Sequence, residues 1–199
     1  MFHDPNRFPV LRALTQATPI FQSELEDLCR DDFLPWPDRG AYVGGWLLFP
    51  LFAAKAPTGF AVDYAAHRRR CPRSMDVLRD HPRVFSAAFS WLDPGGHVTS
   101  HLDEPRAYNL RAQLGLRING DVPLRSNGET RRQRAGEMLL FDTRYQHEIA
   151  NASSSERIAL VLDFEYSLDE EAGLIAEAEM QAGGQRIESA GGFIWRRGW

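Results

Sequence analysis

The sequence predicts a mainly β fold, a sandwich or barrel with helices on its flanks. Between residues 84 and 166, short apolar runs alternate with polar turn residues at fairly regular intervals, a texture typical of antiparallel sandwiches and barrels. A chain of 199 residues that is 43% hydrophobic suffices for one packed core and is short for two. We therefore expect one domain over residues 1–199, with an N-terminal helix and flanking strands in 1–70, the β core in 71–167, and a C-terminal helix and tail in 168–199.

The N-terminal part is expected to contain one amphipathic helix and two strands. Residues 18–34 carry apolar side chains close to helical spacing, and the Thr18-Pro19 pair is a favourable helix start. Residues 46–52 and 60–64 are predicted strands, because both are rich in apolar and aromatic residues and are bounded by glycine and proline.

The β core is expected to begin with a short helix and to continue as strands. The helix is predicted over residues 75–78, because a preceding proline is tolerated in a first helical turn. The strongest turn signals lie at residues 93–96 and 126–128, the second within the polar segment 119–137. Good helix formers over residues 168–182 predict a terminal helix. The predicted strands cover residues 84–92, 97–103, 109–118, 138–142, 143–150 and 157–166.

Charge and cysteine usage exclude several classes of protein. The 23 basic and 27 acidic residues give a net charge of −4, so no nucleic-acid partner is expected. With only two cysteines, Cys29 and Cys71, neither a disulfide framework nor a zinc knuckle is expected, which favours a cytoplasmic location. The most apolar window, residues 44–54, is interrupted by a proline and is too short to span a bilayer, so no membrane partner is expected.

Three residues of the β core form a candidate metal site. If residues 97–103 are a strand, His101 and Asp103 point to the same face, because side chains alternate along a strand. His147 follows 46 residues later, and two histidines with one carboxylate make the triad that leaves positions open on a ferrous ion. His97 shares the same alternation and is an alternative ligand. A single His-x-Asp motif is weak evidence, so a structural barrel in which these residues are unrelated stays open.

Two arginines in the β core are candidate anion partners. Arg157 lies ten residues after His147, and a hairpin of this size predicts that it lies on the neighbouring strand, facing inward. Its planar guanidinium suits a carboxylate; the alternative is a solvated strand edge. Arg111 has apolar neighbours, and a charge there is costly without a partner. That partner is either a bound anion or a structural acid such as Asp142 or Asp163.

Together these segments resemble a known family. The runs at residues 89–103, 109–118 and 136–164 are similar, in order and spacing, to the aspartyl/asparaginyl β-hydroxylase family of iron- and 2-oxoglutarate-dependent dioxygenases. The resemblance covers roughly residues 71–166. It implies a double-stranded β-helix core of the jelly-roll or cupin-like kind, Fe(II) as cofactor, and 2-oxoglutarate and O2 as co-substrates.

The resemblance also assigns roles to residues at the metal site. It implies that His101 and His147 bind the iron. Vertebrate members of the family have glycine where this chain has Asp103 and use the two histidines without a protein carboxylate. Because an aspartate here completes the triad, Asp103 is predicted as a third ligand, and a two-histidine site is the alternative.

Further roles follow for the co-substrate and the substrate. By the resemblance, Arg157 anchors the side-chain carboxylate of 2-oxoglutarate and Ser90 assists it. Arg111 corresponds to a residue that meets a substrate carboxylate. Gln113 stands where the family commonly has a co-substrate-binding histidine, and is suggested as a replacement amide donor.

The expected activity is hydroxylation of an unactivated carbon, the β-carbon of an aspartyl, asparaginyl or related amino acid. The substrate is expected to be a free amino acid or a short peptide, because the N-terminal part lacks the helical repeats that present protein substrates. The alternative is a cupin-like metal-binding or sensing protein without turnover.

Overall fold

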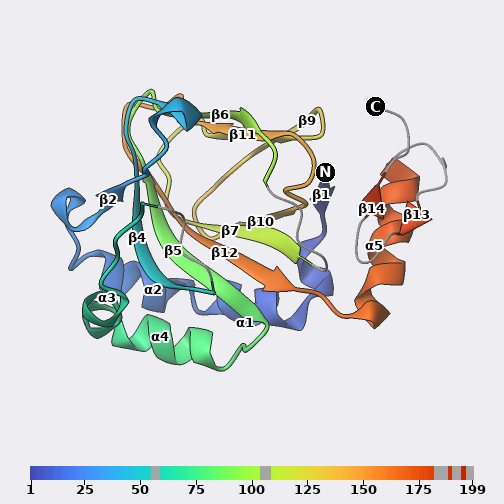
Figure 1. Ribbon diagram of the computed structural model, residues 1–199, viewed down its shortest axis with the longest axis horizontal. Helices are drawn as coiled ribbons and strands as arrows, with labels where there is room; N and C mark the ends of the chain where they lie inside the picture. Colours follow the sequence, from blue (N-terminus) through green and yellow to red (C-terminus); the bar gives the residue numbers. More distant parts are fainter. Residues whose placement is uncertain (55–58, 104–108, 182–187, 190–193, 196–199) are drawn as a thin grey trace.

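Two antiparallel sheets face each other at the centre of the fold (Figure 1). The structure is a computed structural model that describes residues 1–54, 59–103, 109–181, 188–189 and 194–195. Seven strands form the larger sheet, in the order β1-β10-β7-β12-β5-β4-β2, and five form the smaller, in the order β3-β6-β11-β8-β9. Helices α1, α2 and α4 lie along the outer face of the larger sheet (Figure 1).

The bounds of the elements are as follows. The strands are β1 Phe2–His3, β2 Leu34–Pro35, β3 Tyr42–Val43, β4 Trp46–Ala53, β5 Val84–Leu92, β6 His97–His101, β7 Asn109–Arg117, β8 Pro123–Ser126, β9 Glu129–Arg132, β10 Met138–Phe141, β11 His147–Ala150, β12 Arg157–Glu165, β13 Glu188–Ser189 and β14 Ile194–Trp195. The helices are α1 Pro9–Gln16, α2 Thr18–Leu25, α3 Tyr64–Arg70, α4 Pro72–Arg79 and α5 Leu168–Gln181, with short 3-10 turns at Pro5–Arg7, Arg30–Asp32 and Arg39–Ala41.

The chain alternates between the two sheets from β5 to β12. Strands β5, β7, β10 and β12 belong to the larger sheet, whereas β6, the β8–β9 hairpin and β11, which come between them in sequence, belong to the smaller. This rolled arrangement is that of a jelly roll, in which antiparallel strands wrap into two stacked sheets. The predicted double-stranded β-helix core is therefore confirmed.

Strict alternation of side chains in the larger sheet separates the core from the space between the sheets. On β12, Ile158, Leu160, Leu162 and Phe164 pack into a cluster with α1 and α2, while the residues between them face the smaller sheet. On β7, the apolar residues at the even positions 110–116 join the same cluster. Burying each large apolar side chain contributes about 1.5–3 kcal/mol, so this pattern fixes the register of both strands and the direction of the polar residues between.

The N-terminal part differs from its prediction in three places. The helix expected over 18–34 ends at Leu25, because acidic residues cluster at its C-terminal end, where the helix dipole disfavours them. The preceding helix α1 is an additional element. The strand expected over 60–64 is wrong: Asp63 accepts a hydrogen bond from the backbone N–H of Ala66 at 2.9 Å and so caps α3. The strand predicted at 46–52 is confirmed as β4.

The remaining predictions largely agree with the structure. The helix predicted at 75–78 is the longer α4, and the terminal helix is α5. The polar segment 119–137, which was expected only as a connection with a turn, contains the β8–β9 hairpin. Asn127 and Gly128 have φ values of 49° and 80°, as a tight hairpin turn of this kind requires. Of the tail, only β13 and β14 lie within the described residues. That the chain forms one domain stays a prediction.

Candidate functional site

A cavity of about 620 Å³ lies between the two sheets. Its walls come from strands of both sheets and from the segments at residues 36–53 and 60–64. All seven residues predicted for metal, co-substrate and substrate binding line it, namely Ser90, His101, Asp103, Arg111, Gln113, His147 and Arg157. The fold thus brings together residues that are up to 67 positions apart in the sequence.

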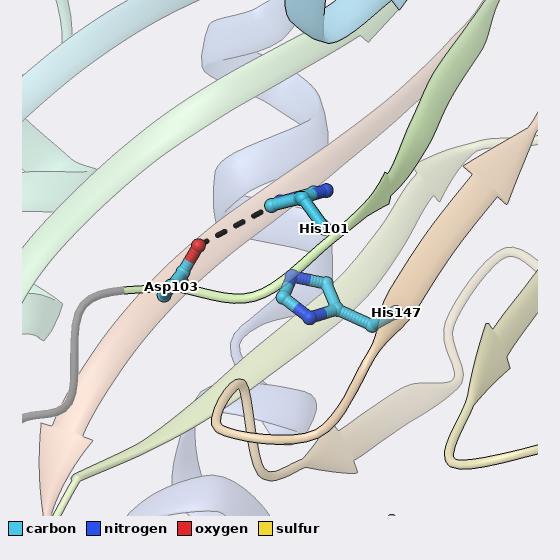
Figure 2. Close-up of side chains that lie close together, drawn as sticks. All are labelled: His101, Asp103 and His147. Carbon is cyan, nitrogen blue, oxygen red and sulfur yellow. Dashed lines mark ion pairs between the residues drawn. The ribbon is translucent and has the colours of Figure 1, made fainter.

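Two histidines face each other at the ends of neighbouring strands. His101 is the last residue of β6 and His147 the first of β11, and the two are direct partners in the antiparallel register. Their ring centroids are 4.2 Å apart, and Figure 2 shows the two rings converging on the same space. Backbone pairing therefore sets the distance between the imidazoles.

Both imidazole rings are oriented by a backbone carbonyl. The Nδ1 atom of His101 lies 2.7 Å from the carbonyl oxygen of Thr99, and that of His147 lies 3.0 Å from the carbonyl oxygen of Tyr145. A carbonyl oxygen only accepts, so Nδ1 carries the proton in each ring and Nε2 presents its lone pair. In metal sites, a hydrogen bond of this kind from the other ring nitrogen fixes the orientation of a histidine ligand.

The carboxylate of Asp103 reaches the histidines from a loop. Strand β6 ends at His101, so the expectation that Asp103 belongs to the same strand is wrong. The backbone N–H of Asp103 instead donates to the carbonyl of Thr143 at 3.1 Å, which ties the loop to the segment before β11. One carboxylate oxygen of Asp103 lies 3.6 Å from Nε2 of His101 (Figure 2).

This set of side chains fits a divalent metal ion. Ligand atoms of His101, Asp103 and His147 all lie within 4.8 Å of one another. The Nε2 atom of His147 is buried and has no hydrogen-bond partner among the described residues, a costly state that a bound cation would relieve. His97 is outside this group, because its Nε2 atom lies 3.1 Å from a carboxylate oxygen of Glu148.

The protonation states at the site favour a cation. Burial lowers the pKa of His147 to about 4, which keeps the imidazole neutral. Burial alone would raise the pKa of Asp103, but the charge of Arg111 holds it below its ordinary value. Neutral imidazoles and an ionised carboxylate are the forms that bind a metal.

Arg111 is held between two carboxylates. Its Nε and Nη2 atoms donate to Asp163 at 2.8 and 3.1 Å, and its Nη1 atom lies 2.8 Å from Asp103. The alternative of a structural acid as partner is therefore what the structure shows for Asp163, whereas Asp142 pairs with Arg144. These carboxylates raise the pKa of Arg111 against the opposing effect of burial. A contact to a substrate carboxylate stays a prediction.

Arg157 lies in the interior, away from any strand edge. Only 2% of its surface is exposed, so the alternative of a solvated edge is excluded. Its strand β12 pairs with β5 and β7, whereas β11 pairs with β6 and β8. The prediction that Arg157 neighbours the strand of His147 is wrong, because the connection between them crosses from one sheet to the other. The alternation of side chains along β12 nevertheless turns Arg157 toward the cavity.

Among the described residues, every hydrogen-bond partner of the Arg157 guanidinium is neutral. Gln133 Oε1 accepts from Nε at 2.9 Å and from Nη2 at 2.8 Å, Gln113 Oε1 accepts from Nη2 at 2.6 Å, and Ser90 Oγ accepts from Nη1 at 3.3 Å. Burial lowers the pKa of Arg157 to about 9. A buried charge without a counterion is expensive, and a bound anion would supply one.

Two features of the site carry no clear signal in the sequence. Gln133 lies in the polar segment after β9, and an isolated glutamine in such a segment is normally solvated. The second feature is the aromatic and apolar wall of the cavity, whose residues lie outside the β5–β12 region. It consists of Trp36, Trp46, Leu48, Pro50, Phe52, Phe60 and Tyr64.

Comparisons with known proteins agree on one family. A family model described as aspartyl/asparaginyl beta-hydroxylase matches residues 15–166. An ornithine lipid ester-linked acyl 2-hydroxylase from Rhizobium tropici is 29% identical over 175 residues, which are 81% of this chain and 59% of that protein. The human aspartyl/asparaginyl beta-hydroxylase is 27% identical over 143 residues, 69% of this chain and 18% of that protein. The chain thus spans less than two thirds of either relative.

Among solved structures, a prolyl-4-hydroxylase from Pseudomonas putida matches with a TM-score of 0.46 at 16% identity. The match covers 75% of this chain and 88% of that one. In the part of the chain that the structure describes, no helix has the length and apolar character needed to cross a membrane.

Proposed function

Because the chain belongs to the aspartyl/asparaginyl β-hydroxylase family, we propose that it is an Fe(II)- and 2-oxoglutarate-dependent hydroxylase of an unactivated carbon. The observation that carries the proposal is the combination found in one cavity. A two-histidine, one-carboxylate group lies in the same space as a buried guanidinium whose described partners are all neutral. The first is a ligand set that suits ferrous iron, and the second suits the distal carboxylate of a keto diacid.

In this proposal the metal ligands are the Nε2 atoms of His101 and His147 and the carboxylate of Asp103. Iron held there would supply the dioxygen chemistry, in which 2-oxoglutarate becomes succinate and carbon dioxide and one oxygen atom enters a C–H bond of the substrate. The backbone carbonyls behind both rings keep the lone pairs aimed at one point. Arg111, itself held by Asp163, fixes the carboxylate of Asp103.

The other end of the co-substrate would be held by Arg157. Its Nη1 atom and the hydroxyl of Ser90 form the open side of the anion site. The hydroxyl oxygen of Ser90 accepts from Trp46 Nε1 at 3.1 Å, so the hydroxyl proton is available for a bound carboxylate. Gln113 contributes its amide oxygen to Arg157, and the replacement of a family histidine by Gln113 keeps a polar group at that position.

The proposed substrate is an aspartyl, asparaginyl or related amino acid, free or in a short peptide, hydroxylated at its β-carbon. The family description supports this assignment. A second candidate is an acyl chain. The aromatic and apolar wall of the cavity and the activity named for the Rhizobium relative both favour it. The wall would in either case exclude water from the reacting centre.

Turnover of 2-oxoglutarate tests the proposal. Protein reconstituted anaerobically with Fe(II) is mixed with 2-oxoglutarate, oxygen and candidate amino acids, peptides or acyl lipids. Succinate is then measured by NMR and the products by mass spectrometry. We expect succinate together with a product that has gained one oxygen atom, and the class of that product separates the two substrates. His97→Ala, at a histidine outside the metal group, is the matched control for His147→Ala. Metal binding without succinate under any substrate would instead identify a cupin-like binding or sensing protein.

A further inference from the structure

The amide side chain of Gln133 is the main support of the buried guanidinium of Arg157. Gln133 follows β9 directly and is 1% exposed. Its oxygen accepts from both Nε and Nη2 of Arg157, and its Nε2 atom donates to the backbone carbonyl of Gln113 at 3.2 Å. Its backbone N–H donates to the carbonyl of Val122 at 2.9 Å. Both the side chain and the backbone of Gln133 are therefore fixed.

A neutral partner has a different effect from an acidic one at this position. An amide oxygen orients a guanidinium through hydrogen bonds but adds no charge. A carboxylate in the same place would make a buried ion pair and cancel the attraction for a second anion. The other acceptors, Gln113 and Ser90, are also neutral. The positive charge of Arg157 is thus oriented by its neighbours and left uncompensated among the described residues.

The contacts of Gln133 also determine which side of Arg157 is open. A guanidinium has five N–H donors, and Gln133 and Gln113 engage those on Nε and Nη2. Nη1 contacts Ser90 alone among the described residues. An incoming carboxylate would therefore meet Nη1 and the hydroxyl of Ser90, on the side away from Gln133.

We propose that Gln133 is a positioning residue for the co-substrate: it holds Arg157 in one orientation while leaving its charge for the distal carboxylate of 2-oxoglutarate. This inference rests on the proposed function. It predicts that an acid at position 133 would satisfy Arg157 from within the protein and exclude the ligand, although the site itself remains well packed.

The test compares Gln133→Glu and Gln133→Leu with the wild type. The affinity for 2-oxoglutarate is measured by calorimetry on protein loaded with redox-inert Mn(II). The melting temperature without ligand and the affinity for Mn(II) are measured in parallel. Gln16→Glu, the same charge change at an exposed residue outside the cavity, is the matched control and should leave the Kd unchanged.

Gln133→Glu is expected to raise the Kd for 2-oxoglutarate about 100-fold, the scale of losing one partner of a buried charge pair. Its melting temperature should stay close to that of the wild type, because the new ion pair with Arg157 offsets the hydrogen bond that Nε2 of Gln133 gives to the carbonyl of Gln113. Its Mn(II) affinity should not change. Gln133→Leu, which removes the hydrogen bonds without adding charge, should lower the melting temperature and raise the Kd by about tenfold. If Gln133 had only a structural role, the affinity for 2-oxoglutarate would instead fall together with the melting temperature in both variants.

The outcomes distinguish a failure of the positioning role from a failure of the proposed function. Wild-type affinity in Gln133→Glu overturns the positioning role and leaves the proposed function intact. If that variant does not fold, an unchanged Kd in Gln133→Leu overturns the positioning role in its place. A wild-type protein that binds Mn(II) but not 2-oxoglutarate overturns the proposed function and this inference with it.

Discussion

Replacing Arg157 by methionine should change the free energy of unfolding by less than about 2 kcal/mol, although the side chain is fully buried. Burial lowers the pKa of this guanidinium to about 9. At about 1.4 kcal/mol per pKa unit, that fall from the ordinary value of an arginine corresponds to a burial cost of roughly 5 kcal/mol. Four hydrogen bonds from Arg157 offset this cost. Each contributes about 1–1.5 kcal/mol, so the two effects nearly cancel.

Arg111→Met is the matched comparison, because Arg111 is another cavity-facing arginine of the larger sheet. Removal of this side chain leaves the carboxylates of Asp103 and Asp163 without their shared cation. Breaking buried ion pairs from one side costs about 3–5 kcal/mol. The two substitutions are chemically identical, so the difference between them isolates the effect of the partners.

Urea unfolding of the metal-free protein at neutral pH, without 2-oxoglutarate, measures both effects. We expect Arg157→Met to unfold near the wild-type urea midpoint and Arg111→Met at a clearly lower one. In the same preparations, Arg157→Met should bind no 2-oxoglutarate. If Arg157→Met is destabilised as much as Arg111→Met, the guanidinium of Arg157 has a counterion in the folded protein and the reasoning is refuted.

Three further predictions concern the metal site and the thiols. His147→Ala should abolish metal binding and succinate formation with an unchanged circular dichroism spectrum, and retained turnover would remove His147 from the site. Asp103→Gly should weaken iron retention by more than about tenfold, the smallest loss typical of replacing a residue that only hydrogen-bonds a metal ligand. An unchanged affinity on metal titration would indicate a two-histidine site. Iodoacetamide at pH 8 should modify Cys29 alone in the native protein and also Cys71 in urea, because Cys29 is exposed while burial raises the pKa of Cys71 to about 12. Labelling of both thiols without urea would contradict that burial.

The alternation of side chains made the inward-facing residues of the β core predictable. His101, Arg111 and Gln113 lie on regular strands, where a period of two decides which face a side chain takes. On β7 the pattern is strong because the opposite face of the strand is packed against helices and its apolar residues cannot turn outward. The predicted strands 97–103 and 143–150 did not report how His101 and His147 converge, because that depends on the pairing of β6 with β11, which makes these two strand-end residues direct partners.

The positions of Asp103 and Arg157 depended on tertiary structure that local patterns do not report. Asp103 lies past the end of β6 and is held by a hydrogen bond to the segment before β11. Turn residues between β11 and β12 indicate that the chain reverses, but they do not indicate that it also changes sheet. Gln133 had no signal at all, because only the folded protein brings it to Arg157, 24 positions away.

A crystal structure of the protein loaded anaerobically with Fe(II) and 2-oxoglutarate tests the central claim most directly. We predict one iron bound by Nε2 of His101, Nε2 of His147 and the carboxylate of Asp103. We also predict that the distal carboxylate of 2-oxoglutarate contacts Arg157 and Ser90. Iron bound elsewhere, or a co-substrate whose carboxylate avoids Arg157, would contradict the claim that one cavity serves both.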